Sequence, residues 1–363
     1  MNHIIFEDLF VLEMANNHYG KLERGLKIVR EYSRIVRFNN VRAAIKFQLR
    51  DVESFIHQDF RERADIRYIK KTLDTQMSRA DFTILAEAIK KAGCIPMATP
   101  FDERSVDLCV DLALPIIKLA SSDVNDWVLI ERIAHTRKPV ICSTGGTSLK
   151  DLDDLVTFFG NRNIPLAINH CVSLYPCEDS DLELNQIDYL RKRYPNHVIG
   201  LSTHEYQNWD ASLQIAYAKG ARTFERHIDI DDDGKPVSPY CSLPSQIDSW
   251  FKAYNRAKIM CGSGGETRRT VSDAEAKYLN GLVRGVYAKR DLPIGHVLHH
   301  ESIDKDVYLA IPLQKGQISC RELMHGETLL HPVVKDRPIL IDAIDSAYAY
   351  HEELKKLIYE RGI

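Results

Sequence analysis

The chain has 363 residues, of which 44% are hydrophobic and 27% charged, and its formal net charge is −3. This balance gives no electrostatic reason to expect nucleic acid or a membrane surface as a partner. No apolar run approaches the roughly 18 residues of a spanning helix, and the acidic N-terminus lacks the regions of a signal peptide. We therefore expect a globular, cytoplasmic protein that binds neither nucleic acid nor a membrane.

Short apolar runs that end in polar residues alternate with helix-like stretches through the first 265 residues. In chain order the runs are LFVLEMANN, AAIKFQLR, CIPMATPFD, LPIIKLASSD, PVICSTGG, LAINHCVSLYP, VIGLSTHE and TFERHIDID. The connectors, such as RADFTILAEAIKKAG and DASLQIAYAKGA, repeat apolar residues every three or four positions. Strands that alternate with helices favour a parallel sheet, and eight such units predict a (β/α)8 TIM barrel over residues 1–265.

A charged segment interrupts this alternation between Arg50 and Met77 and contains two arginine-rich patches. A loop of this length on the active-site side of a barrel often acts as a lid or contacts the substrate. A solvated helical face explains the same composition equally well. Both interpretations therefore stand at this point.

The pattern changes after the last predicted barrel helix, SQIDSWFKAYNRAKIM. Residues 266–282 are rich in Gly, Ser, Thr and charge, which is typical of a linker. Residues 283–363 contain short β-rich pieces between turn residues and end in an amphipathic helix. We predict a compact β-rich module that packs against a barrel, because a module of this size buries little core of its own.

In a TIM barrel the active site lies at the carboxyl ends of the strands. Ser202 and His204 in GLSTHE are two residues apart, as are Glu225 and His227 in FERHID, so each pair points to one side of its strand. Two histidines on adjacent strands can converge on one divalent ion and leave positions open for water and substrate. We predict that His204 and His227 bind a metal, with a purely structural role as the alternative.

Two lysines occupy similar strand ends. Lys46 shares a face with Gln48 in IKFQ, and Lys118 ends the apolar run LPIIK. An inward lysine is costly unless it meets an anion or a carboxylate. With the hydroxyl groups at neighbouring strand ends, the lysines predict a cradle for a phosphate and a carboxylate. These hydroxyl groups belong to Thr99, Ser121, Ser143, Ser173 and Ser202.

The carboxylates at the strand ends admit two roles. Glu13 and Glu225 are candidate general acid/base groups, because a carboxylate in a partly dry site can have a raised pKa. Alternatively, the lysines pair with Glu13, Glu225 or Asp123 and only stabilise the barrel. Tyr175 in SLYP is a further candidate for substrate contact.

Taken in chain order, EMANNHYG, IKFQ, MATPFD, IIKLASSD, STGG, SLYP, GLSTHE and FERHID resemble the sialic acid synthase family. That family condenses phosphoenolpyruvate with an N-acetylhexosamine to make nonulosonic acids. The segment VRGVYAKRDLPIGHVL resembles the antifreeze-like (SAF) domain of the same family. The resemblance covers nearly the whole chain and implies a TIM barrel followed by a SAF domain over residues 283–363.

The resemblance also implies a role for each site residue and a place in surface polysaccharide biosynthesis. The implied roles are phosphoenolpyruvate binding for Lys46, Thr99, Lys118, Ser121, Ser143, Ser173 and Ser202, catalysis for Glu13, Glu225 and Tyr175, sugar binding for Asn17, Gln48, Asp123 and Arg321, and Mn²⁺ binding for His204 and His227. It further implies a domain-swapped homodimer, in which the C-terminal module of one subunit caps the barrel of the other.

Three departures affect the sugar half of the site. STHE replaces the usual SDHT, which places Thr203 and Glu205 around His204. Ser238 stands near the position of an aspartate that contacts the sugar. The arginine-bearing RPG stretch is replaced by YLAIPLQKGQISCREL, in which Arg321 is the candidate substitute. These changes leave the phosphoenolpyruvate half intact and are compatible with an acceptor other than N-acetylmannosamine.

Two other functions compete with the synthase. A Schiff-base aldolase or lyase would use Lys46 or Lys118 as a nucleophile of lowered pKa and would need no metal. A non-catalytic sugar- or anion-binding protein would explain Ser238 and the altered C-terminal module. The pair His204 and His227 argues against the first, and the retained phosphoenolpyruvate positions argue against the second.

Overall fold

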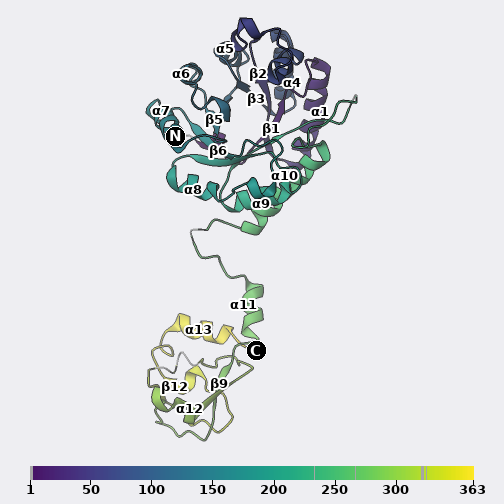
Figure 1. The fold of residues 1–363 in the computed structure, drawn as a ribbon. Coiled ribbons are helices and arrows are strands. Elements are labelled where there is room, and N and C mark those ends of the chain that lie inside the picture. The colour runs from purple at the N-terminus through teal and green to yellow at the C-terminus, as the bar shows by residue number, and fades with distance from the viewer. Residues whose placement is uncertain (1–2, 233, 266, 320–322, 324) are drawn as a thin grey trace. The chain divides into compact units, whose positions relative to one another are not determined.

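A computed structural model describes residues 3–232, 234–265, 267–319, 323 and 325–363. The chain divides into two compact units, Met1–Gly262 and Ser263–Ile363 (Figure 1). Within the described residues, no helix combines the length and the apolar character needed to cross a bilayer.

The first unit is a closed barrel of parallel strands that pair in chain order, β1 with β2 and so on, until β8 pairs with β1. The predicted TIM barrel is therefore confirmed. The strands are β1 (Leu9–Ala15), β2 (Arg42–Leu49), β3 (Ile95–Pro100), β4 (Ile116–Leu119), β5 (Val140–Ser143), β6 (Leu166–Cys171), β7 (Val198–Thr203) and β8 (Thr223–His227).

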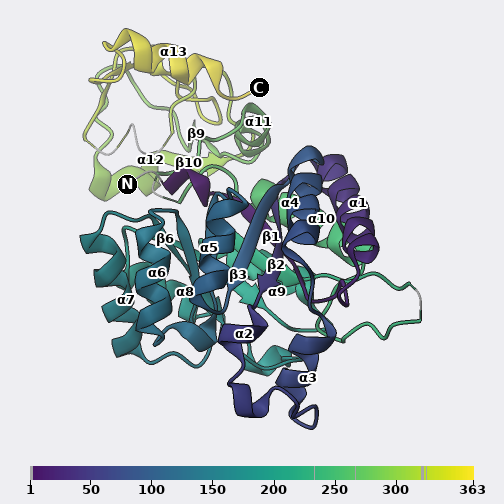
Figure 2. The ribbon, with the colours of Figure 1, turned by 90° about the horizontal axis from the view of Figure 1, so that it is seen from above.

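Helices surround the barrel and bury their apolar faces against the strands (Figure 2). They are α1 (Leu22–Asn39), α4 (Arg79–Lys91), α5 (Glu103–Asp111), α6 (Trp127–His135), α7 (Leu149–Asn161), α8 (Gln186–Arg193), α9 (Trp209–Ala218) and α10 (Pro244–Cys261). Several begin where the sequence supplies a capping side chain: Ser78, Asp102, Asp126 and Ser148 each accept a hydrogen bond from a backbone N–H of the first turn.

The interior of the barrel changes character along its axis. At the amino end the inward residues form an apolar cluster that includes Phe6, Leu9, Val11 and Met97. On β1 the inward position that follows Val11 is Glu13. Inward positions recur with period two, so β1 to β7 each carry an apolar residue in the lower layer. On β8 the position two residues before Glu225 is the buried Thr223. The side chains that line the cavity at the carboxyl ends of the strands are mostly polar. This pattern closes the barrel below and leaves a polar site above.

The charged segment after β2 folds into α2 (Val52–Phe55), the 3-10 turn η2 (Gln58–Phe60) and α3 (Arg67–Asp74). Figure 2 shows α2 and α3 together outside the ring of barrel helices. Two further 3-10 turns, η3 (Ser121–Asp123) and η4 (Asp179–Asp181), follow β4 and β6, and η1 (His3–Ile5) precedes β1.

The second unit has a core of its own, which includes Val286, Leu298, Ile318, Ile339 and Ile344. Strand β9 pairs antiparallel with β10, and β11 pairs antiparallel with β12. The elements are α11 (Asp273–Asn280), β9 (Gly285–Ala288), η5 (His300–Ser302), α12 (Ile303–Asp306), β10 (Val307–Ala310), β11 (Thr328–Leu329), η7 (Ile341–Ala343), β12 (Ile344–Asp345) and α13 (Glu352–Glu360). A SAF-type identity for this unit stays a prediction.

The predicted linker of residues 266–282 needs one correction, because α11 occupies half of it. The Ser272 side chain accepts a hydrogen bond from the backbone N–H of Glu275 and so caps this helix. A polar composition alone therefore misled the prediction, since it hid a serine followed three residues later by a glutamate.

Candidate active site

One cavity opens at the carboxyl end of the barrel. Its volume is about 640 Å³, within the range of roughly 300–1,000 Å³ that small-molecule sites occupy. Every strand of the barrel contributes to its wall. The predicted site residues that line it are Glu13, Asn17, Lys46, Gln48, Thr99, Lys118, Ser121, Asp123, Ser143, Ser173, Tyr175, Ser202, His204, Glu225 and His227. Arg321 lies outside the described residues, and the roles of all these residues stay predictions.

Two lysines and two glutamates form the floor of the cavity, and none is more than 5% exposed. The Lys46 ammonium contacts the Glu13 carboxylate and lies 3.4 Å from Glu225 Oε1. The Lys118 ammonium lies 3.7 Å from Glu225 Oε2. The lysines therefore do meet carboxylates, as the structural alternative expects, but they do so inside a cavity large enough for a ligand.

Hydroxyl groups complete this floor. Lys46 Nζ donates to Thr99 Oγ1 at 2.8 Å, and Lys118 Nζ donates to Ser143 Oγ at 2.6 Å. In the turn after β5, the Gly145 N–H donates to Ser121 Oγ at 3.0 Å. A Cβ at Gly145 would come within 2.0 Å of Ser173 Oγ. The glycine is thus required for the close approach of the turn to the hydroxyl groups.

The two glutamates differ in acidity. Burial raises the pKa of Glu13, and the attraction of Lys46 does not offset it, partly because Glu225 repels the Glu13 charge. Burial would also raise the pKa of Glu225, but the charges of Lys118 and Lys46 outweigh it and lower that pKa. A neighbouring pair with pKa values pushed apart is the arrangement that acid/base chemistry uses. Glu13 is therefore the weaker acid of the pair and Glu225 the stronger one.

The two predicted metal ligands face each other across the ends of β7 and β8, with ring centroids 5.4 Å apart. His204 Nδ1 lies 3.0 Å from the Val172 carbonyl, which can only accept, so the proton is on Nδ1 and the Nε2 lone pair is free. Burial lowers the pKa of His204 to about 4 and that of His227 well below its ordinary value. Both rings are therefore neutral near pH 7, which is the form that binds metals.

The donor set around these histidines is small. Among the described residues, no group of three or more His, Cys, Asp or Glu side chains is placed to hold one ion. Glu13 and Glu225 contact the lysines of the floor. Two neutral imidazoles, with the Nε2 of His204 free, fit a divalent ion whose other ligands are water and substrate.

Aromatic rings cover the histidines. The Tyr175 ring lies 3.9 Å from that of His204, centroid to centroid, and the Tyr240 ring lies 5.2 Å from that of His227. Burial raises the pKa of Tyr175, so its phenol keeps its proton and acts as a hydrogen-bond donor. Tyr240 lines the cavity, whereas Ser238, two residues earlier, is not part of its wall.

Thr203 and Glu205 flank His204 in sequence, as the STHE motif has them, but neither side chain lines the cavity. The Glu205 carboxylate is fully buried, accepts hydrogen bonds from Thr203 and Ser212, and pairs with Arg226 at 3.0 Å. Arg226 also donates to the Glu205 carbonyl. Because Arg226 precedes His227, this buried pair ties the ends of β7 and β8 together behind the two histidines.

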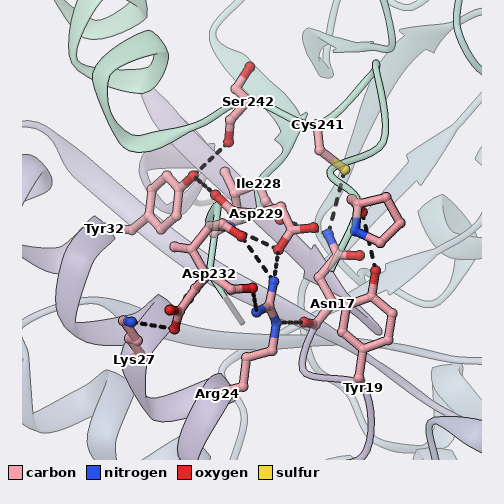
Figure 3. A network of polar contacts seen from close by, with 12 residues as sticks. Asn17, Tyr19, Arg24, Lys27, Tyr32, Ile228, Asp229, Asp232, Cys241 and Ser242 are labelled. Carbon is pink, nitrogen blue, oxygen red and sulfur yellow. Dashed lines mark hydrogen bonds and ion pairs between the residues drawn. The ribbon is translucent and has the colours of Figure 1, made fainter. Parts of the chain in front are cut away.

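Asn17, predicted to bind the sugar, uses its side chain to hold the β8–α10 connection (Figure 3). Its amide donates to the Ile228 carbonyl at 2.8 Å and to Cys241 Sγ at 3.5 Å. In the same network the buried Arg24 pairs with Asp229 at 2.8 Å and donates to the Asn17 carbonyl at 2.7 Å (Figure 3). Asn17 thus contacts the cavity while it fixes the connection that carries Tyr240.

The charged segment after β2 contributes a cationic rim to the cavity. Arg50, Arg67 and Lys71 line the cavity, together with Phe55 and Tyr68. The Arg50 guanidinium lies 3.8 Å from the centroid of the Phe101 ring and donates to Gln48 Oε1 at 2.9 Å. Burial lowers the pKa of Arg50 to about 10. Of the two interpretations of this segment, contact with the cavity is thus the one that the geometry favours.

The residues of the rim were not among the predicted site residues, although the segment that carries them was noted. Arg67 and Lys71 are four residues apart, which puts them on one face of a helix, but this spacing does not show that the face looks over a cavity. Tyr240 had no signal beyond its place after the last strand.

The buried pair Glu205–Arg226 makes a test of stability possible. Glu205→Gln should lower the free energy of unfolding by about 3–5 kcal/mol, because the Arg226 charge stays buried without its partner. The measurement is urea unfolding followed by circular dichroism. Glu131→Gln is the matched control, because Glu131 forms its 3.1 Å ion pair with Arg162 at the surface and should cost at most about 1 kcal/mol. Equal losses for both variants would show that the buried pair has no special weight.

The chain is similar to sialic acid synthases and to proteins of spore coat polysaccharide biosynthesis. The N-acetylneuraminate-9-phosphate synthase of Drosophila melanogaster is 28% identical over 372 residues, which cover 92% of this chain and 95% of that protein. A Chromobacterium violaceum structure named for spore coat polysaccharide biosynthesis protein E is 35% identical, with a TM-score of 0.87 over 93% of this chain and 100% of that one. The N-acetylneuraminic acid synthetase of Leptospira borgpetersenii is 26% identical, with a TM-score of 0.64 over 75% of this chain and 91% of that one.

Residues 40–266 match the NeuB family, a span that runs from the start of β2 to beyond the end of α10. The matched span contains the strand ends that carry Lys46, Lys118 and Glu225, whereas Glu13 precedes it. The resemblance read from the strand-end motifs is thereby confirmed, and the chain belongs to the NeuB family.

Proposed function

We propose that this chain condenses phosphoenolpyruvate with an aldose of the N-acetylhexosamine type to give a nonulosonic acid and phosphate. The observation that carries the proposal is the meeting of two buried lysines, their hydroxyl partners and two neutral histidines in one cavity. Relatives named N-acetylneuraminate-9-phosphate synthase and N,N'-diacetyllegionaminic acid synthase support this reaction class. The first relative is named for a phosphorylated product and the second for a product without phosphate. The acceptor of this chain is therefore inferred from its own cavity.

Phosphoenolpyruvate would bind on the floor of the cavity. Lys46 and Lys118 would each exchange a carboxylate partner for an oxygen of the phosphate or of the substrate carboxylate, while Thr99 and Ser143 stay within hydrogen-bond reach. Charged hydrogen bonds in a dry site hold the substrate in one orientation, which removes much of the entropy cost of the bimolecular step.

A divalent cation held by His204 and His227, Mn²⁺ in our proposal, would polarise the aldehyde. The enol carbon attacks the aldehyde carbon, so that a carbon–carbon bond forms and the carbonyl electrons move to oxygen. Glu13, whose pKa is raised, is the group that donates a proton to this oxygen. Water adds to the cationic carbon that carries the phosphate, and Glu225 accepts one proton of that water. The carbon–oxygen bond to phosphate then breaks while the new hydroxyl group becomes the keto group, and the hydroxyl proton leaves with the phosphate.

Glu225 suits the role of proton acceptor. Its Oε2 has no hydrogen-bond donor within the described part of the chain, although Lys118 lies nearby. A carboxylate oxygen without a donor can accept from a water molecule or a substrate hydroxyl group. Tyr175, whose phenol stays protonated, is placed beside His204 to donate a hydrogen bond to the sugar.

The competing Schiff-base mechanism is disfavoured at Lys46. Burial alone would lower the pKa of this lysine, but the charges of Glu13 and Glu225 outweigh burial and raise it. A lysine held in the charged form is a poor nucleophile. Trapping with borohydride in the presence of a keto acid would detect a Schiff base if one formed at either lysine.

The reaction is tested by incubating the full-length chain with phosphoenolpyruvate, Mn²⁺ and a panel of aldoses, and by measuring phosphate release and product mass. His204→Ala and His227→Ala should each lower phosphate release at least about 100-fold, because the loss of several kcal/mol of charge stabilisation has that effect. His135→Ala, at the exposed end of α6, is the control. Undiminished turnover after chelation, with metal analysis to confirm removal, would contradict the metal dependence.

The floor assignment is tested at Lys118. Lys118→Met should weaken phosphoenolpyruvate binding by about 10- to 150-fold, because a charged hydrogen bond of about 1.5–3 kcal/mol is lost. Calorimetric titration without acceptor measures this directly. Lys150→Met is the control, since Lys150 is 81% exposed in its side chain and pairs with Asp154 on α7. Normal affinity in Lys118→Met would show that phosphoenolpyruvate binds elsewhere.

We also propose a homodimer in which the C-terminal unit of one subunit caps the barrel of the other. The separate cores of the two units support this arrangement, because the barrel is complete without the second unit. A cap would keep water from the reacting enol.

Truncation after Ser272 tests the assembly. It should leave the barrel folded, give a monomer by light scattering and lower turnover sharply, because the cap is missing. Circular dichroism provides the control for folding. A monomer with full turnover would mean that the C-terminal unit has another task.

A further inference from the structure

We propose that Arg67 and Lys71, assisted by Arg50, form an anion subsite at the rim of the cavity. The acceptor is then an aldose that carries a phosphate or a carboxylate at the end remote from its aldehyde. This inference rests on the proposed condensation for the orientation of the acceptor. The subsite itself rests on the geometry of α3 and on the charges around it.

Helix α3 presents two different faces. Arg67, Tyr68, Lys71 and Thr72 line the cavity, and their spacing of four residues places them on one side of the helix. Lys70 is not part of the cavity wall and pairs instead with Asp74 at 2.5 Å. Both lysines are exposed, but only Lys71 looks over the cavity.

The cations of the rim lack the ion pairs that their neighbours make. Around them, Arg63 pairs with Asp65, Arg104 with Asp51 and Lys70 with Asp74. Within the part of the chain that the structure describes, no carboxylate lies within 4.0 Å of the charged nitrogens of the three rim cations, Arg50, Arg67 and Lys71. Three cations that converge without such partners repel one another unless an anion joins them.

The carboxylates of the cavity wall do not neutralise this rim. Glu13 and Glu225 are engaged by the lysines of the floor. Asp123 is the remaining carboxylate; it attracts Arg50, and burial raises the pKa of Asp123 to about 6. Even with Asp123 ionised, the rim keeps an excess of two positive charges, counted as three cations less one carboxylate.

The three cations lie close enough to act on one another. The pKa of Lys71 is lowered by burial and then by the positive charges of Arg50 and Arg67. Lys71 lines the same cavity as His204 and His227, beside which the aldehyde of the acceptor would lie.

The geometry of the reaction gives the orientation of the sugar. Its aldehyde must lie between the enol carbon on the floor and the two histidines, so the rest of an open-chain sugar extends toward the rim. The ring of Tyr68, which is 69% exposed, and that of Tyr240 offer apolar surface along this path. An anionic group at the far end of the sugar would then arrive among Arg67, Lys71 and Arg50.

The test measures binding without turnover. The ligands are an N-acetylhexosaminitol 6-phosphate, the corresponding 6-carboxylate and the neutral N-acetylhexosaminitol, none of which has an aldehyde. Calorimetry with the full chain should show at least about tenfold tighter binding of one anionic compound than of the neutral one, since a charged hydrogen bond contributes about 1.5–3 kcal/mol. The tighter of the two anions identifies the phosphate or the carboxylate as the natural group.

Variants locate the effect. Arg67→Gln and Lys71→Gln should each weaken the anionic compound about 10- to 100-fold and leave the neutral compound unchanged. Arg63→Gln and Lys70→Gln are matched controls from the same segment and should change neither affinity. Unchanged affinity for phosphoenolpyruvate, which binds on the floor, shows that the rim variants are folded.

Two outcomes separate this subsite from the proposed condensation. If the neutral compound binds as tightly as the anionic ones, or if the rim variants have no effect, the subsite is wrong, whether or not phosphate is released with neutral aldoses. If the anionic compound binds through Lys71 and no aldose releases phosphate from phosphoenolpyruvate, the condensation is wrong and the subsite stands.

Discussion

Four charged side chains meet inside the barrel at the level where its apolar layer ends. Burying one of these charges alone would cost several kcal/mol. Pairing with an opposite charge offsets much of that cost, but not all of it. Along the line of contacts Glu13, Lys46, Glu225 and Lys118 the charges alternate in sign, so each charge faces an opposite one. The same arrangement separates the pKa values of the two glutamates. Stability and acid/base function therefore depend on one set of contacts, and an anion can enter only by replacing some of them.

The histidines depend on contacts that lie outside the cavity. Behind the barrel wall, Glu205 and Arg226 connect the ends of β7 and β8. Above it, Arg24 and Asp229 hold the connection that carries Tyr240 (Figure 3). Residues that touch no substrate thus fix the distance between the imidazoles. The proposed metal site, with few protein ligands, would need such support, because outer contacts set the orientation of each ring.

Much of the barrel and of its floor followed from the sequence, because both depend on local periodicity. Alternation with period two puts Lys46 and Gln48 on one face, and it does the same for Glu225 and His227. Asn17 and Glu205 were placed less well. Nearness to a strand end does not reveal which side a residue faces once the strand has ended, and Glu205 turned outward to meet Arg226.

The sequence did not reveal the rim residues, for a different reason. A helix with many charges is usually solvated, and nothing local shows that Arg67 and Lys71 look over a cavity while Lys70 does not. That distinction depends on how the insertion folds back on the barrel. A linker composition likewise concealed α11, whose cap at Ser272 is a local signal of only two residues.

The cavity combines a floor whose charges cancel with a rim whose charges do not. The chain as a whole carries a net charge of −3, so long-range attraction of anionic substrates has to come from the rim. Clefts walled by low-dielectric protein focus such local fields and raise the encounter rate of charged ligands. The floor, by contrast, acts at contact distance, where a substrate oxygen competes directly with Glu13 or Glu225 for a lysine. In this arrangement the rim would attract anionic substrates and the floor would carry the chemistry. The insertion after β2 supplies the rim.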